Sequence, residues 1–341
     1  MPEIAVILNP NSRKNRRAQA GRVGRLARAL GARGVVRETP SLDALPETLR
    51  ELLADDELRY LVADGGDGSL HWVLNESLAV LAEAALRARP LPPIMPTNGG
   101  TIDFVARKVG IRGDAENLVG RLASELSLGA APQIVEVDTL ELTGTQLRPD
   151  GREQPFRKLG FALAAGGIGQ RFFDKYYRER ELGAGAIVRV VTRAVASHLA
   201  ERAGAPLPEK ALRYGREVFS PTPARVTIDG ERVPGSRHGA IHAGSIDVVL
   251  GGVFRVFPLA REPGQLHFQA GDIRPLEIIR AIPELVRGGA IPSRHLVEKA
   301  GREMLIEADG ELLCPVIDGE LFRGLTRLEV RAGPRVRVPR V

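Results

Sequence analysis

The first third of the chain alternates short apolar runs with segments whose apolar residues recur at helical spacing. Strand-like runs fall at 3–10, 34–40, 60–63 and 92–96, and helix-like segments at 15–30, 42–55, 70–89 and 103–111. This order predicts a parallel β-sheet with helices on both faces, because helices that connect parallel strands pack back onto the sheet. We therefore expect an α/β domain over residues 1–132.

Three polar loops each follow a predicted strand of this sheet. They read NPNSR at 9–13, DGGDGS at 64–69 and PTNGGTID at 96–103. Ligands of parallel sheets bind beyond the carboxyl ends of the strands. Since all three loops are rich in Asn, Ser, Gly and Asp, this edge of the sheet is expected to bind a nucleotide.

The loop at 64–69 lies between a predicted strand and a predicted helix. Gly65, Gly66 and Gly68 allow positive φ and put no Cβ in the way of a ligand. The N–H groups at the start of the following helix suit phosphate oxygens. The alternative is a tight turn in which Asp67 or Ser69 caps the helix, and a short motif by itself does not decide between the two.

The predicted secondary structure changes near Pro132, from alternating strands and helices to mainly strands. Segments such as QIVEVDTLELTG, ARVTIDGERV and QLHFQAGDI read as strands with Gly, Pro and Asp between them, interrupted by helical stretches at 169–200 and 275–287. We expect a mainly antiparallel β-sandwich over 133–322. Closing strands at 323–341 would follow it, with a return to the N-terminal domain left open.

Length and composition limit the class of protein. A chain of 341 residues suggests two domains, and 43% apolar with 26% charged residues describes a globular protein. No apolar run is long enough to span a bilayer, the N-terminus does not resemble a signal peptide, and the single Cys314 excludes an internal disulfide. These features favour a cytoplasmic protein.

The chain is basic, with a net charge of +6 and a sequence pI of about 9.8. Such a balance suits nucleic acid, an anionic membrane or a phosphorylated substrate. Proteins that bind nucleic acid usually also have aromatic side chains that stack on bases, or a recognisable binding module. Aromatic residues make up only 4% of this chain. Nucleic acid is therefore the least favoured of these partners.

Four segments in order resemble the diacylglycerol kinase catalytic family of soluble lipid kinases, which is related to sphingosine and ceramide kinases and to NAD kinases. VILNPNS is similar to the family's opening strand and Asn-Pro loop, and GGDGSLHWVLN to its Gly-Gly-Asp-Gly-Thr signature. GTIDFVARKVGI is similar to its Gly-Thr-x-Asn-(Asp/His)-Phe-Ala-Arg stretch, and IDGELFRGLTRLEV to its closing Asp-Gly-Glu segment. The resemblance implies an active site in the cleft between the two domains.

Several positions depart from the family pattern. Ser69 replaces threonine and keeps a hydroxyl, while Arg13 stands where glycine is common. Asp103 takes the usual asparagine position, and a slip of one residue would equate it with the following aspartate. Pro263 replaces the aspartate that holds a structural Mg²⁺ in some bacterial relatives. His71 is similar to the sphingosine kinase branch and leaves the lipid substrate open.

The resemblance implies roles for particular residues. Glu320 would be the base that accepts the proton of the lipid hydroxyl, and a competing Asp-Gly-Glu ends at Glu311, where Asp309-Gly310 is expected to form a hairpin turn. Asp67 would organise Mg²⁺ beside the phosphates, because a carboxylate cannot usefully touch phosphate itself. Asp103 is a second metal candidate, with a helix cap as the alternative. The implied nucleotide-binding residues are Asn9, Pro10, Ser12, Thr39, Gly65, Gly66, Gly68, Ser69 and Thr101.

Plain turns remain the alternative for Asn9, Ser12, Thr39 and Glu320. The histidines other than His71 show no spacing that suggests a site, and Cys314 is expected to pack rather than react.

The expected function is that of an ATP- and Mg²⁺-dependent kinase that phosphorylates a hydroxyl of diacylglycerol, ceramide, a sphingoid base or a similar neutral lipid. The enzyme would take its lipid from a membrane surface. We therefore expect a cytoplasmic enzyme that associates peripherally with the inner face of the membrane. No nucleic-acid partner is expected. The oligomeric state stays open, a dimer included. One alternative is an NAD kinase-like enzyme. Such enzymes carry a Thr-Pro-x-Gly-Ser-Thr-Ala-Tyr signature, which the segment FSPTPARVTIDG of this chain does not match. The other alternative is a regulator that binds nucleotide or lipid without catalysis.

Overall fold

The structure, a computed structural model, describes residues 2–12, 15, 21–250, 252–289 and 291–341. It divides into a first unit, residues 1–137 with 335–341, and a second unit, residues 138–334. The expected boundaries were 132/133 and 322/323. In the structure the closing strands are split, because β20 (Leu325–Ala332) lies in the second unit and β21 (Val336–Arg340) in the first.

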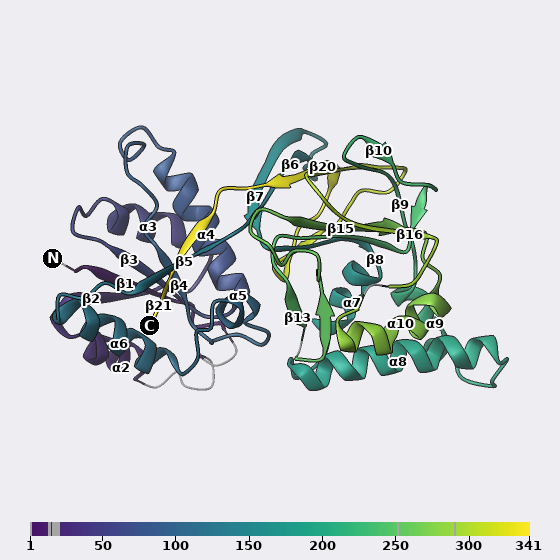
Figure 1. The fold of residues 1–341 in the computed structure, drawn as a ribbon, viewed down its shortest axis with the longest axis horizontal. Helices are drawn as coiled ribbons and strands as arrows, with labels where there is room; N and C mark the ends of the chain where they lie inside the picture. Colours follow the sequence, from purple (N-terminus) through teal and green to yellow (C-terminus); the bar gives the residue numbers. More distant parts are fainter. Residues whose placement is uncertain (1, 13–14, 16–20, 251, 290) are drawn as a thin grey trace. The chain divides into compact units, whose positions relative to one another are not determined.

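The first unit contains a four-stranded parallel sheet in the order β2 (Gly34–Glu38), β1 (Ile4–Leu8), β3 (Tyr60–Asp64) and β4 (Ile94–Pro96). Helix α2 (Arg22–Leu30) packs with α6 (Ala115–Ser127), and α3 (Leu45–Leu53) packs with α4 (Asp67–Leu81), so that helices cover both faces of the sheet (Figure 1). β5 (Gln133–Val137) pairs with β21, which also contacts β4. The α/β prediction for this region is confirmed.

Helix ends in the first unit differ from those that apolar periodicity predicts. α4 begins at Asp67, inside the glycine loop, rather than at residue 70, and it ends at Leu81 rather than near 89. The short α5 (Phe104–Lys108) follows the third loop. α6 begins where the Asp114 side chain accepts a hydrogen bond from Asn117 N. Part of the helix expected at 15–30 lies outside the described residues.

The described residues of the second unit form two large antiparallel sheets and one small hairpin. The first sheet has the order β10 (Glu231–Arg232), β9 (Thr222–Ile228), β17 (Glu303–Ala308), β20, β6 (Leu140–Leu147) and β7 (Glu153–Gly160), with β11 (Arg237–His238) also paired to β9. The second has the order β16 (Leu296–Gly301), β15 (Leu266–Gly271), β12 (Ala240–Gly244), β8 (Ala162–Gly167), β18 (Val316–Ile317) and β19 (Glu320–Leu321). A small hairpin pairs β13 (Val248–Leu250) with β14 (Phe254–Val256).

Both sheets contribute to one apolar core, as expected for a sandwich. Leu142 and Val330 enter it from the first sheet, and Phe268 and Ile241 from the second. Along β15, residues 266, 268 and 270 face this core, so residues 267 and 269 face the opposite side of the sheet. The antiparallel prediction for the second unit is confirmed.

The described part of the second unit has four helices: α7 (Ile168–Tyr176), α8 (Ala184–Arg202), α9 (Glu209–Val218) and α10 (Pro275–Arg287). The single helical stretch expected at 169–200 is therefore broken, and Gly183, with φ at 146°, precedes α8. α9 was not predicted, whereas α10 has the expected bounds. No helix in the described part of the chain combines the length and apolar character needed to span a bilayer.

The hairpin expected at Asp309-Gly310 is wrong. β17 pairs with β9 and β20 in the first sheet, and the next strand, β18, pairs with β8 in the second. Residues 309–315 therefore carry the chain from one sheet to the other, and Glu311 is exposed on this crossing.

Candidate nucleotide site and acceptor carboxylate

The polar loops of the first unit are joined at the carboxyl edge of its sheet. Asn9 Nδ2 donates to Ser69 Oγ at 3.0 Å, which links the loops after β1 and β3. Gly99 N donates to Gly65 O at 2.9 Å, which links the loops after β3 and β4. Asn11 Nδ2 donates to Pro40 O at 3.0 Å, next to Thr39. The sequence placed these segments at one edge, and the structure joins them there.

The glycines of two loops pack backbone against backbone. A Cβ on Gly66 would lie 2.6 Å from the Cα of Gly100, and a Cβ on Gly100 would lie 2.4 Å from the Cα of Gly66. Gly99 is equally close to Gly65, at 2.7 Å from its Cα. No side chain fits at these four positions. We call this contact the glycine crossing, and it requires glycine whether or not a ligand is present.

The start of α4 has no side-chain cap. The cap residue is Gly66, with φ at −96°, and no side chain bonds to the first turn from that position. The alternative in which Asp67 or Ser69 caps this helix is therefore wrong. Since the first N–H groups of a helix have no intrahelical acceptor, those of Gly68 and Ser69 suit an anion.

Asp67 instead caps a different helix. Its carboxylate accepts hydrogen bonds from Phe104 N at 3.2 Å and Val105 N at 3.3 Å, at the start of α5. A carboxylate oxygen is also the type of ligand that Mg²⁺ takes in proteins. Asp67 thus ties the glycine loop to the third loop.

Asp103 stands at the cap position of α5 but does not cap it. It is 4% exposed, its φ of 51° is left-handed, and its Oδ1 accepts from Gly100 N at 2.9 Å. Gly100 belongs to the glycine crossing, and Asp103 Oδ1 would lie 3.5 Å from a Cβ on Gly66. Both metal candidates, Asp67 and Asp103, therefore belong to the joined loops.

The other predicted nucleotide contacts lie around this edge. Asn9 Oδ1 accepts from Asn11 N at 2.9 Å, so an Asx turn is present as well. Ser12 Oγ is buried and has no hydrogen-bond partner among the described residues. Pro10 is buried, Thr39 N donates to Leu8 O at 3.0 Å, and Thr101 is half-buried in the third loop.

Four polar residues behind the loops were missed by sequence reasoning: Arg22, Asp64, Asn15 and Thr97. Asp64 ends β3 and is fully buried, paired with Arg22 of α2. The signal was a carboxylate that closes an apolar strand, since such a group is rarely buried without a partner.

Glu320 belongs to a tight hairpin of the second unit. β18 and β19 are joined by Asp318 and Gly319, whose φ values of 51° and 91° match a two-residue turn with left-handed geometry at both positions. Asp318 Oδ1 accepts from Phe161 N at 2.8 Å and Ala162 N at 2.9 Å, which fixes the turn to β8. Glu320 follows it, half-buried, and its carboxylate has no partner among the described residues.

Comparison with known proteins bears on the first unit most directly. Residues 3–131 match the model of the diacylglycerol kinase catalytic domain. The first unit is therefore similar to this catalytic domain over most of its length. The family consists of lipid kinases, and the glycine loop and uncapped α4 lie inside the matched segment. No curated protein matches the chain at a significant level.

Solved structures resemble both units of the chain. Three proteins from Bacillus anthracis str. Sterne match with TM-scores of 0.63, 0.57 and 0.61. Each match covers 97% of this chain and 93–94% of the other, at 14–15% identity. One is described as a diacylglycerol kinase and two as candidate diacylglycerol kinases. At this identity the likeness shows a shared fold.

The loops fit a nucleotide with Mg²⁺. Among the described residues no group of three His, Cys, Asp or Glu side chains could hold a metal. Mg²⁺ does not need such a group, because it keeps several waters and takes one or two carboxylates together with substrate phosphates. Asp67 and Asp103 would supply the carboxylates. The buried Ser12 hydroxyl and the first N–H groups of α4 would face the phosphates.

Proposed function

We propose that the protein is an ATP- and Mg²⁺-dependent lipid kinase that transfers the γ-phosphate to a hydroxyl of a neutral lipid. The observation that carries the proposal is the uncapped start of α4, held by the glycine crossing inside a segment of the diacylglycerol kinase catalytic family. Diacylglycerol, ceramide and sphingoid bases all offer the required hydroxyl.

The first unit would bind the nucleotide. Phosphoryl transfer needs the two reacting oxygens to be held in line and the charge on the transferred group to be neutralised. The N–H groups of Gly68 and Ser69 donate to phosphate oxygens, and Ser12 Oγ adds a hydroxyl. Bound Mg²⁺ would offset phosphate charge, and Asp67 and Asp103 would hold it.

Glu320 would act on the acceptor. A lipid hydroxyl is a weak nucleophile at neutral pH, so a carboxylate that takes its proton as the new P–O bond forms would accelerate transfer by roughly 10²–10⁴-fold. Glu320 suits this role because its carboxylate is half-buried and has no partner among the described residues, on a turn that Asp318 fixes.

The acceptor would be taken from a membrane surface. Neutral lipids reside in bilayers, and the net charge of +6 favours an anionic surface. The proposal therefore includes a cytoplasmic enzyme that associates peripherally with the inner face of the membrane, and it leaves the oligomeric state open.

The test is transfer of radiolabel from γ-labelled ATP to a detergent-solubilised panel of diacylglycerol, ceramide and a sphingoid base, resolved by chromatography. We expect label in at least one lipid, and only when Mg²⁺ is present. A parallel reaction with NAD as the acceptor tests for NAD kinase activity. Label in NADP alone, with none in lipid, would show that the protein is an NAD kinase and not a lipid kinase. Nucleotide binding without transfer to any acceptor would favour a regulator.

Glu320→Gln tests the assignment of the base. We expect transfer to lipid to fall by roughly 10²-fold or more, with ATP affinity and melting temperature near wild type, because the carboxylate meets the acceptor and not the nucleotide. Glu311→Gln is the matched control, since Glu311 follows the other Asp-Gly pair and is exposed. An inactive Glu311→Gln beside an active Glu320→Gln would reverse the assignment, and two active variants would place the base elsewhere.

A further inference from the structure

Asp64 is the centre of a buried polar network behind the glycine loop. Its side chain is fully buried and accepts two hydrogen bonds from Arg22, from Nε to Oδ2 at 3.0 Å and from an Nη to Oδ1 at 2.8 Å. Thr97 Oγ1 donates to Oδ1 at 2.9 Å, and Asn15 Nδ2 lies 3.3 Å from Oδ2. Every described contact to this carboxylate is therefore a donor.

The same network reaches each nucleotide loop. Thr97 Oγ1 accepts from Gly65 N at 3.1 Å, next to the glycine crossing. The Asp64 carbonyl accepts from Asn9 N at 3.1 Å, and Asn15 Nδ2 donates to Asn9 O at 2.9 Å. Asp64 thus connects the ends of β1, β3 and β4, through its carboxylate to Thr97 and Asn15 and through its carbonyl to Asn9.

Arg22 compensates the Asp64 charge. It is 8% exposed, and although burial lowers the pKa of a guanidinium, the hydrogen bonds and attraction of Asp64 outweigh this and raise the pKa of Arg22. Arg22 also lies 3.6 Å from Glu116, which pairs with Arg25 at 3.1 Å. Glu116 is partly exposed, so Asp64 is the only fully buried charge in this group.

We propose that Arg22 and Asp64 are a positioning pair for the nucleotide: they fix the three loops, and Arg22 cancels a negative charge directly behind the phosphate-binding turn. The inference rests on the proposed nucleotide site. Both side chains are buried behind the loops, so both would act on a nucleotide through the loops.

The pair has an electrostatic asymmetry. Loss of Arg22 leaves an uncompensated carboxylate one residue before Gly65, where it repels phosphate. Loss of the Asp64 charge leaves a cation, which does not. Removing one member of a buried ion pair is costly for stability in either case, whereas neutralising both is often tolerated. If the pair were merely structural, both single variants would be less stable than wild type. Their nucleotide affinities would then not depend on whether the remaining charge is negative or positive.

Calorimetric titration of the full chain with Mg²⁺ and a non-hydrolysable ATP analogue tests this, with melting temperatures measured in parallel. Arg22→Gln is expected to raise the Kd by about 10-fold or more, which corresponds to about 1.4 kcal/mol. Asp64→Asn should raise it clearly less. The double variant Arg22→Gln/Asp64→Asn should return to within about 3-fold of wild type. Arg22→Lys, which keeps the charge, should bind better than Arg22→Gln and serves if the glutamine variant does not fold.

Arg25→Gln is the matched control, because Arg25 lies on the same helix and pairs with Glu116 but not with Asp64; its Kd should equal that of wild type. Equal losses of affinity in both single variants, without recovery in the double variant, would overturn the proposal and leave a structural pair. Unchanged affinity in Arg22→Gln would overturn it as well. A wild-type chain that binds no nucleotide would overturn the proposed function and this inference together.

Discussion

Asp67 combines a structural contact with a candidate chemical role. Its carboxylate accepts from two N–H groups at the start of α5, although it lies in the first turn of α4. Sequence reasoning offered a choice between a cap and a metal ligand. The structure shows a cap for another helix, and the metal role stays part of the proposal.

Asp67→Asn separates the two roles. Asparagine retains one acceptor oxygen, so the melting temperature should fall only modestly. Turnover should fall by about 10²-fold or more, because the charge that would hold Mg²⁺ is lost. Asp114→Ala is the control: it removes the side-chain cap of α6, at a cost of about 1 kcal/mol, and should leave turnover near wild type. An Asp67→Asn enzyme with more than about half of wild-type turnover would exclude the metal role.

At the scale of elements, local sequence patterns predicted most strands and some helices, whereas contacts between distant segments could not be predicted from them. The strands of the first unit, the polar loops after them and the bounds of α10 followed from periodicity and turn residues. The break between α7 and α8 did not, because apolar residues continue at helical spacing on both sides of Gly183. α9 was missed because its sequence, EKALRYGREV, is mostly charged or polar and contains a glycine, so few apolar residues mark it as a helix.

Contacts between loops could not be predicted in the same way. The glycine crossing joins residues 65–66 to 99–100, and the Arg22–Asp64 pair joins the start of α2 to the end of β3. Local sequence patterns do not determine which glycines of the two loops contact each other, or which arginine pairs with Asp64. Both contacts depend on how the strands are aligned in the parallel sheet.

The glycine crossing leads to a prediction about stability. Gly100→Ala should destabilise the chain by about 1–3 kcal/mol, because its Cβ would meet the backbone of Gly66 at 2.4 Å, and it should weaken nucleotide binding. Gly24→Ala is the matched control, since nothing lies within 4 Å of a Cβ there and the residue is inside α2. That variant should gain up to about 1 kcal/mol. Denaturant titrations of both variants measure the difference, and equal stabilities would contradict the crossing.

A second element-scale feature is a buried histidine on the outer side of the second sheet. His267 is fully buried, and its Nδ1 accepts from Leu259 N at 3.2 Å, which places its proton on Nε2. Burial first, and then repulsion from His242, lower the pKa of His267 to about 4, against a smaller opposing effect of Asp247. The folded state therefore holds this ring neutral at a pH where the unfolded chain begins to bind a proton.

This histidine should make the second unit sensitive to acid. The unfolded state binds more protons between about pH 6.5 and pH 4, so the stability from the neutral ring is present above pH 6.5 and is lost as pH falls to about 4. The full effect is about 3 kcal/mol. His267→Gln can still accept from Leu259 N but does not titrate, so its free energy of unfolding should fall less across this window. Parallel curves for the two proteins would show that His267 does not contribute.

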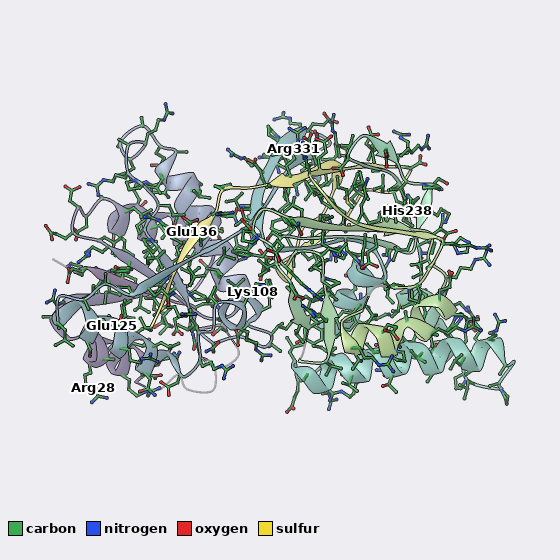
Figure 2. The ribbon with its side chains drawn as sticks, viewed as in Figure 1. Arg28, Lys108, Glu125, Glu136, His238 and Arg331 are labelled. Carbon is green, nitrogen blue, oxygen red and sulfur yellow. The ribbon has the colours of Figure 1, made fainter. Side chains whose placement is uncertain are left out.

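At the scale of the molecule, the chain combines two units whose fold resembles that of solved structures, and it exposes many charged side chains. Exposed basic side chains occur in both, among them Arg28 on α2 and Arg331 on β20 (Figure 2). With 48 basic and 42 acidic residues, the excess is modest and mostly arginine. Many of these arginines are already paired with carboxylates, as Arg331 is with Glu303 at 3.0 Å.

The excess charge leads to a prediction about membrane binding. A basic residue near an anionic bilayer contributes about 1 kcal/mol, and salt screens this within a Debye length of about 10 Å at 0.1 M. We expect the protein to sediment with vesicles that contain anionic lipid, and the bound fraction to fall as salt rises. The run Arg13, Lys14, Arg16 and Arg17, which lies outside the described residues, is one candidate contact. Replacing its four residues with glutamine should weaken sedimentation if it touches the surface, while Arg28→Gln serves as a single-charge comparison. Equal binding to neutral and anionic vesicles, or binding that salt does not change, would show that apolar contacts and not charge bring this protein to its lipid.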